Sequence, residues 1–207
     1  MSSERIVERR RGAGSGLALV VSGPSGAGKN TAINALLTRD PRLAYSVSHT
    51  TRRPRPGESE GVDYHFVSGD AFDALADAGE FLEHVTYLGD RYGTSRAEIA
   101  RLAALGRDIV LNIDVQGARA LRARTVPGVA LAFVFFAPPS LADLEARLRA
   151  RGSEGEAERA NRLRVAREEL DAIKIFDYLV VNDELDQVVR ELEAIVAAER
   201  LRVRTSG

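Results

Sequence analysis

The segment from Gly23 to Lys29 reads Gly-Pro-Ser-Gly-Ala-Gly-Lys, between an apolar run at Leu17–Ser22 and a helical stretch that continues to Leu37. This order predicts a phosphate-binding turn, because backbone N–H groups and the positive end of a helix converge on one point and Lys29 adds a mobile cation. The alternative is an ordinary Gly-rich turn with an unrelated surface lysine. We expect triphosphate contacts from Gly23, Pro24, Ser25, Gly26, Ala27, Gly28, Lys29, Asn30 and Thr31.

The residue after the lysine departs from the nucleoside-triphosphate pattern, which has Ser or Thr there to contact Mg²⁺. This chain has Asn30, followed by Thr31. Successive helix residues point about 100° apart, so Thr31 cannot simply replace the missing hydroxyl. We therefore expect Thr31 to face an inner phosphate. Asn30 should not bind the metal directly and should at most contact the metal's own ligands.

A second group of cations lies on the segment Ser48–Glu58, where Arg52, Arg53 and Arg55 fall within four residues beside two prolines. Guanidinium groups grip a phosphate through paired hydrogen bonds, and prolines reduce the entropy lost when a loop is ordered. This pattern favours a second phosphate site. A charged, solvated surface loop is the alternative if the segment is considered alone.

Composition limits the classes of protein that this chain can belong to. Its 207 residues, 44% of them hydrophobic, fit one globular domain with small insertions, and the net charge of −1 provides no overall attraction for nucleic acid or anionic membranes. The absence of cysteine excludes disulfides, thiolate metal sites and a cysteine nucleophile. We expect a cytoplasmic protein with no nucleic-acid or membrane partner, and residues 1–16 to form a flexible arm; a nucleic-acid-binding arginine tail is the alternative there.

The elements that must position these residues alternate between strands and helices. Short, nearly continuous apolar runs predict strands of a parallel sheet at Leu17–Ser22, Ile109–Ile113, Ala130–Phe136 and Tyr178–Val181. Apolar residues at helical spacing from Leu185 to Val196 predict a final helix, and Ser140 with Asp143 resembles a capping box. The pattern favours a doubly wound α/β fold with phosphates at the carboxyl ends of the strands.

Two regions interrupt this alternation. Residues 47–92 contain the arginine-rich loop, an alternating strand at Asp63–Val67, a short helix from about Asp70 and a strand at Phe81–Tyr87, which predicts a small β-containing insertion. Residues 149–162 have alanine as their only apolar type. We expect that second segment to be mobile rather than packed in a core.

Many short motifs, in the same order, make this sequence resemble guanylate kinase, a family that transfers a phosphoryl group from ATP to GMP. The resemblance spans roughly residues 17–200. It is carried by the Gly-rich turn, by the segment from Val47 to Gly57, and by Gly61–Phe66, Phe81–Glu83, Tyr92–Ser95, Ile113–Gly117, Ala137–Ser140, Arg147–Gly152 and Val180–Asp183.

The resemblance implies a P-loop core at 17–46 and 93–207, with a mobile helical lid at about 147–165 and a GMP-binding insertion at 47–92. It implies that the GMP phosphate contacts Arg52, Arg55, Tyr64 and Tyr92, and that guanine contacts Ser48, Glu83, Thr94 and Asp114. It further implies ATP contacts from Arg147, Arg151 and Asn182, and catalytic roles for Lys29, Arg52, Arg151 and Arg162.

The chemistry of guanine agrees with a role for Glu83, because a carboxylate can accept from both N1–H and the exocyclic amine, whereas adenine has an acceptor at N1. From the sequence alone, a solvated carboxylate at a strand edge is the alternative. Asn112 stands where the family usually has aspartate, so direct Mg²⁺ anchoring there is in doubt. We expect Mg²⁺ to be held through ATP phosphates and water near Asn30, Asn112 and Asp114.

Three functional readings follow from these residues. The first is a kinase that uses ATP, with Mg²⁺, to phosphorylate GMP and dGMP. Assembly of this kinase into a homo-oligomer is left open. The second is an inactive module of the same fold that binds a phosphorylated or acidic partner through the arginine loop; the retained Gly-rich turn argues against it. The third is a kinase for another monophosphate, and Glu83 argues against AMP or CMP.

Overall fold

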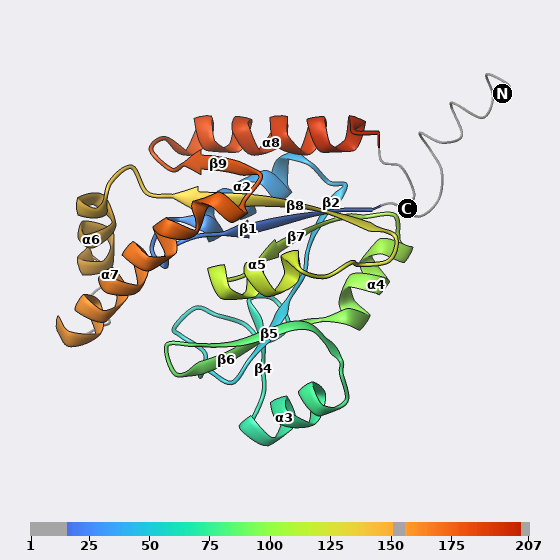
Figure 1. Cartoon of the computed structure of the whole chain (residues 1–207), viewed down its shortest axis with the longest axis horizontal. Helices are drawn as coiled ribbons and strands as arrows, with labels where there is room; N and C mark the ends of the chain where they lie inside the picture. The colour runs from blue at the N-terminus through green and yellow to red at the C-terminus, as the bar shows by residue number, and fades with distance from the viewer. Residues whose placement is uncertain (1–15, 151–155, 204–207) are drawn as a thin grey trace, which may run out of the picture.

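The computed structural model describes residues 16–150 and 156–203, and its core is a five-stranded, all-parallel sheet with the strand order β2-β7-β1-β8-β9 (Figure 1). Four strands were predicted from the sequence, and all four are present. The fifth, β2, has three residues, which is too short for an apolar pattern. The strands are β1 (Gly16–Ser22), β2 (Leu43–Tyr45), β7 (Asp108–Asn112), β8 (Val129–Ala137) and β9 (Tyr178–Val181).

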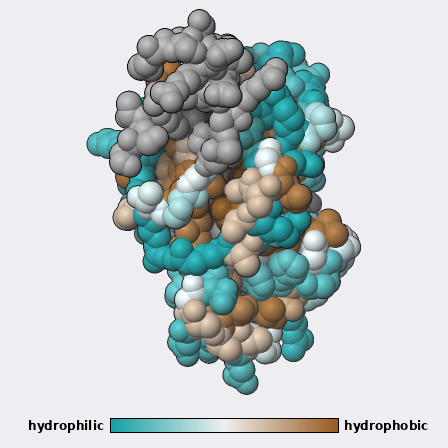
Figure 2. Space-filling view, turned by 90° about the vertical axis from the view of Figure 1, so that its right-hand side faces the viewer, coloured by the Kyte–Doolittle hydropathy of each residue, from teal (hydrophilic) through white to brown (hydrophobic). Residues whose placement is uncertain are grey.

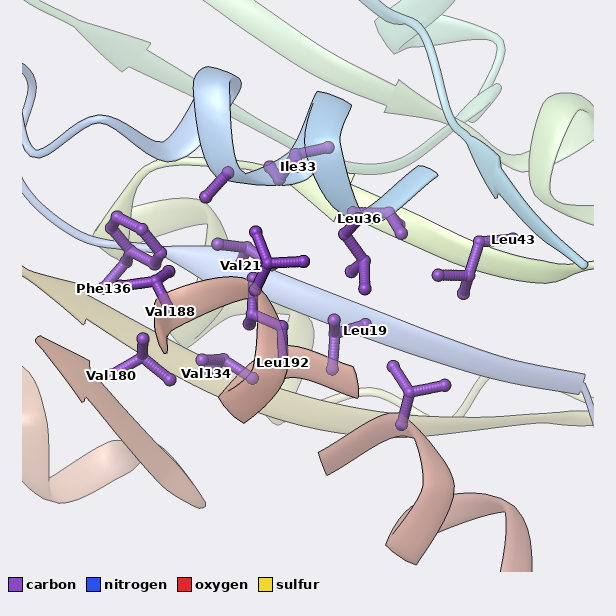
Figure 3. Packing of buried hydrophobic residues seen from close by; sticks show 14 of the residues in the cluster. Leu19, Val21, Ile33, Leu36, Leu43, Val134, Phe136, Val180, Val188 and Leu192 are labelled. Atoms are coloured by element: carbon purple, nitrogen blue, oxygen red, sulfur yellow. The ribbon is translucent and has the colours of Figure 1, made fainter. Parts of the chain in front are cut away.

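Helices cover both faces of this sheet, as the predicted doubly wound fold requires (Figure 1). On one face, Ile33 and Leu36 of α2 and Val188 and Leu192 of α8 pack on strand residues such as Leu19, as Figure 3 shows. On the other face, α4 and α5 pack against β1 and β7. These helices are α2 (Lys29–Arg39), α4 (Arg96–Ala104), α5 (Val115–Arg122) and α8 (Leu185–Leu201).

The predicted insertion forms a second sheet of four strands, in the order β4-β3-β6-β5, below the main sheet in Figure 1. Its elements are β3 (Ser48–Thr50), β4 (Tyr64–Phe66), α3 (Gly69–Asp77), β5 (Phe81–Tyr87) and β6 (Asp90–Ser95). Strand β3 lies within the segment expected to be a loop. Strand β6 continues to Ser95, across the expected division between residues 92 and 93, because it pairs along its length with β5.

Two helices follow β8, at the left of Figure 1: α6 (Leu141–Ala150) and α7 (Glu156–Leu170), with a 3₁₀ turn, η1 (Asp171–Ile175), after them. The structure has one of the two backbone bonds of the predicted capping box: Ser140 Oγ accepts a 3.1 Å hydrogen bond from Asp143 N, and the Asp143 carboxylate accepts from the Ser140 hydroxyl. Leu144, Leu148 and Ala166 form a small buried cluster with Leu163 against it. The expected lid at 147–165 therefore lies partly on packed helix, while 151–155 fall outside the described residues, as do residues 1–15 of the expected arm.

Figure 2 shows the face at the right-hand side of Figure 1, where hydrophilic residues predominate and hydrophobic ones occur in small separate areas. Within the described residues, none of the helices has the length and apolar content needed to cross a membrane.

Arg200, near the end of α8, joins three segments that are distant in the sequence. Its guanidinium group bonds Asp108 Oδ2 at 2.6 Å and Asp40 Oδ2 at 2.5 Å, and 18% of its side chain is exposed. Asp108 also accepts from the backbone N–H of Leu17, at the start of the central strand. Ion pairs therefore join the last helix to the start of β7 and to the residue after α2, and Asp108 extends this connection to the start of β1 through a hydrogen bond.

We predict that Arg200→Ala lowers the free energy of unfolding by about 3 kcal/mol, because it leaves the largely buried Asp108 carboxylate without its cation and leaves Asp40 with only the exposed Arg42. Thermal and urea unfolding would measure the change. The matched control is Arg202→Ala. The Arg202 side chain is 64% exposed, so the loss of its ion pair with Glu199 should change the free energy of unfolding little. Equal stability of the two variants would contradict the prediction.

Candidate active site

A cavity of about 340 Å³ lies between the Gly-rich turn and the small sheet. It brings together most of the residues that the sequence suggested for nucleotide binding. The predicted residues that line it are Gly23, Ser25, Gly26, Gly28, Lys29, Asn30, Thr31, Ser48, Arg52, Arg55, Tyr64, Glu83, Tyr92, Asn112, Asp114 and Arg162. Pro24, Ala27, Thr94, Arg147 and Asn182 are not in the lining, and Arg151 lies outside the described residues.

The surroundings and the backbone conformation of the Gly-rich turn require glycine at two of its positions. A Cβ on Gly23 would lie 2.2 Å from the carbonyl oxygen of Phe136, and Gly28, with φ of 96°, directly precedes the first residue of α2. Both positions need glycine, one for space and one for conformation. Lys29 begins the helix, and its Nζ donates to the carbonyl oxygens of Gly23 and Pro24, the latter at 3.0 Å.

Residues beyond the turn hold its backbone from outside the cavity. Arg147 donates to the carbonyl oxygens of Ala27, at 3.1 Å, and Asn182, at 2.9 Å. The Asn182 side chain donates to Ala27 as well, at 2.6 Å. Arg162 Nη1 donates to Ser25 Oγ at 2.9 Å. Arg147 and Asn182 therefore support the turn in this structure, whereas Arg162 also faces the cavity.

The arginine-rich segment is held by a carboxylate that the sequence reading did not single out. Arg52 forms a two-pronged ion pair with Glu58, at 2.9 and 2.8 Å, and its guanidinium carbon lies 5.4 Å from the ring centre of Tyr64. The backbone N–H of Arg55 donates to the same carboxylate at 2.7 Å. Arginine binds phosphate through the same pair of parallel N–H···O bonds, so a phosphate could take the place of this carboxylate.

Glu83, on β5, is buried at 2% exposure instead of lying at a solvated strand edge. Thr94 donates to its Oε1 at 2.6 Å, while Oε2 is buried with no hydrogen-bond partner among the described residues. Burial raises the pKa of Glu83 to about 7; the Thr94 hydrogen bond opposes this shift, and the charge of Asp114 adds to it. A Cβ on Gly117 would lie 2.8 Å from Oε2, so the small residue there makes room for the carboxyl group.

Asp114 lies after β7 and caps α5, where its Oδ1 accepts from the backbone N–H groups of Gln116, at 2.7 Å, and Gly117, at 2.9 Å. Burial raises its pKa, and these backbone bonds and the charge of Lys29 act in the opposite direction. At the end of the same strand, Asn112 Nδ2 donates to Asn30 Oδ1 at 2.7 Å. Within the part of the chain that is described, no group of three acidic or histidine side chains could hold a metal ion by itself.

Three residues near the site were missed in the sequence: Glu58, Tyr87 and Glu169. Tyr87 lines the cavity at the end of β5, and Glu58 holds Arg52. Glu169 lies next to Glu168 in a charged helix, so nothing in the sequence marks it as buried, yet it is 7% exposed. Only Glu58 had a signal, its position at the end of the arginine-rich segment.

The parallel sheet with a Gly-rich turn between β1 and α2, and a cavity over that turn, defines a P-loop nucleotide-binding protein. The model of the family "Guanylate kinase" matches residues 15–199. The chain is 46% identical to the guanylate kinase of Alkalilimnicola ehrlichii over 91% of each chain, and 46% identical to that of Aromatoleum aromaticum over 90% of each. The crystal structure of guanylate kinase from Anaplasma phagocytophilum, 32% identical, superposes with a TM-score of 0.72 over 91% of this chain and 88% of the other. This chain belongs to the guanylate kinase family.

The raised pKa of Glu83 predicts a pH dependence of stability. The folded protein holds this proton more tightly than the unfolded chain, whose pKa is near 4.5, so folding loses stability as pH rises from there through about 7. Glu83→Gln should reduce the loss between about pH 5 and pH 8 by up to about 3 kcal/mol. Urea unfolding at both pH values would measure it.

The control for that experiment is Glu80→Gln, which changes an exposed carboxylate three residues away. Its pH dependence should match that of the wild type. If Glu83→Gln also keeps the wild-type slope, the buried carboxyl group does not carry the effect.

Proposed function

We propose that this protein transfers the γ-phosphate of ATP to GMP, giving ADP and GDP, and that it accepts dGMP as well, within purine nucleotide metabolism. The observation that carries the proposal is the buried Glu83 with a free oxygen in the same cavity as Lys29 and Arg52. One cavity thus contains a hydrogen-bond acceptor for a base, Glu83, and cations for two phosphate groups, Lys29 and Arg52. The names of the curated relatives support phosphoryl transfer over the inactive module.

On the proposed acceptor side, the insertion at 47–92 binds GMP. Arg52, Arg55, Tyr64 and Tyr92 take its phosphate, which displaces Glu58 from the Arg52 fork, because a dianion interacts with guanidinium more strongly than a carboxylate. Ser48, Thr94 and Asp114 surround the base beside Glu83. All except Thr94 line the cavity, and Thr94 acts by orienting Glu83 through their hydrogen bond.

Glu83 selects the base because guanine offers two adjacent donors, N1–H and the exocyclic amine, to one carboxylate. Both donors favour the ionised form, so guanine binding lowers the pKa that burial had raised. Adenine would leave the buried Oε2 without a donor, and an unpaired buried polar group is costly.

On the proposed donor side, the core at 17–46 and 93–207 binds ATP. The backbone of the Gly-rich turn, with Thr31, contacts the phosphates, and Lys29, Arg162 and Arg151 neutralise charge on the group in transfer. Arg147 and Asn182 keep the turn in shape through the carbonyl of Ala27. The acceptor is already an ionised phosphate, so no general base is needed, and positioning by Lys29 and by arginines from both sides supplies the rate enhancement.

The residues at the mouth of the turn do not fit a direct magnesium ligand set. The Asn30 oxygen already accepts from Asn112, both side chains are neutral, and Asp114 Oδ1 caps α5. We propose that Mg²⁺ arrives bound to ATP and keeps its phosphate and water ligands, with Asn30 and Asn112 outside them. We also propose a cytoplasmic location.

A coupled assay of ADP production with GMP, AMP, CMP and UMP tests the proposed activity: only GMP should give substantial turnover. Glu83→Gln replaces a double acceptor by one acceptor and one donor, so kcat/KM for GMP relative to AMP should fall by about a hundredfold or more. Unchanged selectivity in the variant would mean that another residue recognises the base. Turnover with none of the four would contradict the activity itself.

Asn30→Ser supplies the hydroxyl that the P-loop pattern has at this position, so we predict a lower free Mg²⁺ concentration for half-maximal rate. Thr31→Ala is the matched neighbour and should chiefly weaken ATP binding. A magnesium titration of all three proteins, at fixed ATP and GMP, measures this. The assignment of the two positions is wrong if Asn30→Ser needs as much metal as the wild type, or if Thr31→Ala alone changes the requirement.

A further inference from the structure

The side chain of Glu83 reaches the nucleotide cavity because strand β5 is irregular just before it. Alternate residues of a regular strand point to the same face, so Phe81 and Glu83 would lie side by side. The structure separates them. The centre of the Phe81 ring lies 5.9 Å from that of His84, and Phe81 packs directly on Gly93, whereas Glu83 lies against Gly117 of α5. Phe81 and Glu83 therefore occupy opposite faces of the small sheet.

A β-bulge at Leu82 accounts for this change of direction. Phe81 pairs with Ser95 and Glu83 pairs with Thr94, so Leu82 is the extra residue without a partner on β6. Leu82 is packed in the buried cluster that includes apolar residues of α5, the helix directly above β5 in Figure 1. Two successive residues, Leu82 and Glu83, thus face α5, and the bulge turns the carboxyl group toward the cavity.

The carbonyl group of the bulge is held by Arg124, which lies two residues after the end of α5. Its Nη1 donates to the carbonyl oxygen of Leu82 at 2.7 Å, across 42 positions of the sequence. Leu82 is 3% exposed, and a buried carbonyl group outside the regular strand ladder needs such a donor. The backbone N–H of Arg124 donates to the Leu121 carbonyl at 2.9 Å, which fixes the point from which the side chain extends.

Arg124 is not placed to touch a nucleotide. It is an exposed residue, and it does not line the nucleotide cavity. Burial raises the pKa of Glu83, and the charge of Arg124 acts in the opposite direction, so Arg124 also favours the ionised carboxylate. Any effect of Arg124 on a bound base must therefore pass through Leu82 and Glu83.

We propose that Arg124 is a positioning residue for base selection: its hydrogen bond to Leu82 maintains the bulge that aims Glu83 into the cavity. The inference rests on the proposed function, since it takes Glu83 as the group that recognises guanine. Loss of the bond leaves a buried carbonyl group without a donor. A strand without the bulge cannot keep Phe81 and Glu83 on opposite faces, so a weakened bulge loosens the direction of the carboxyl group.

The test compares the binding of GMP with that of inosine monophosphate, which keeps N1–H and lacks the exocyclic amine. Glu83 discriminates between the two only when its carboxylate is aimed to accept from both donors of guanine. Calorimetry would give the Kd of each nucleotide for the wild type and for Arg124→Met, which removes the donors from a side chain of similar reach. The preference for GMP should fall by about threefold to tenfold, the range expected from one hydrogen bond, while the Kd of an ATP analogue stays within about twofold.

Two further variants separate this role from a merely structural one. Arg124→Lys keeps a cationic donor and should retain most of the preference for GMP. In a Glu83→Gln background, Arg124→Met should change the preference by less than about twofold, because Arg124 acts through Glu83. An equal fall in both backgrounds, or no fall in the single variant, overturns the inference.

The matched control is Arg96→Met. Arg96 Nε also donates to a backbone carbonyl oxygen close to β5, that of Gly79 at 3.1 Å, but away from the bulge. Its preference for GMP should equal that of the wild type, and a fall as large as that of Arg124→Met would contradict the role of the bulge. A wild type that binds both nucleotides equally, or that does not turn over GMP, would instead contradict the proposed function, so the two failures are distinguishable.

Discussion

The arrangement of this protein depends on how tightly the chain turns at the end of β1. Strand β8 runs beside β1 to its last residue, so the turn at Gly23 passes close to the carbonyl oxygen of Phe136, where no side chain fits. The chain is thereby directed over the carboxyl end of the sheet before α2 begins. Lys29 and the amides of the turn, which could bind a phosphate, are positioned by that one close approach.

Elements distant in the sequence then keep the turn in shape. Arg147 from α6 and Asn182 from the end of β9 both donate to the carbonyl of Ala27, and Arg162 from α7 reaches Ser25. On the other side of β1, Asn112 at the end of β7 donates to Asn30 in the first turn of α2. The phosphate-binding turn is therefore anchored on both sides, and two of these side chains, Arg147 and Asn182, act from outside the cavity lining.

The second constraint is the burial of acidic groups around the cavity. Glu83 and Glu169 each have an oxygen without a partner, and burial raises the pKa of both to about 7. In the nucleotide cavity, the charge of Arg52 is paired with that of Glu58. This cavity thus holds one unsatisfied acceptor, Glu83, and one displaceable anion, Glu58, which suits a ligand that brings base donors and a phosphate together.

The sequence by itself determined the main sheet and the position of the Gly-rich turn, because buried strands and their flanking helices leave periodic apolar patterns. It also indicated the arginine-rich segment, since three arginines fall within four residues. It missed β2 and β3, whose three residues are too few for any period, and it set the limit of the insertion inside β6 because pairing between strands is not local.

Only the tertiary structure decided which charged residues are buried and what they contact. Glu83 looked equally suited to a solvated strand edge, and its burial depends on the space left by Gly117, 34 positions further along the chain. Glu169 looks the same in the sequence as its exposed neighbour Glu168. Desolvation and hydrogen bonding depend on neighbours brought together by folding, and a pattern along the chain carries no record of them.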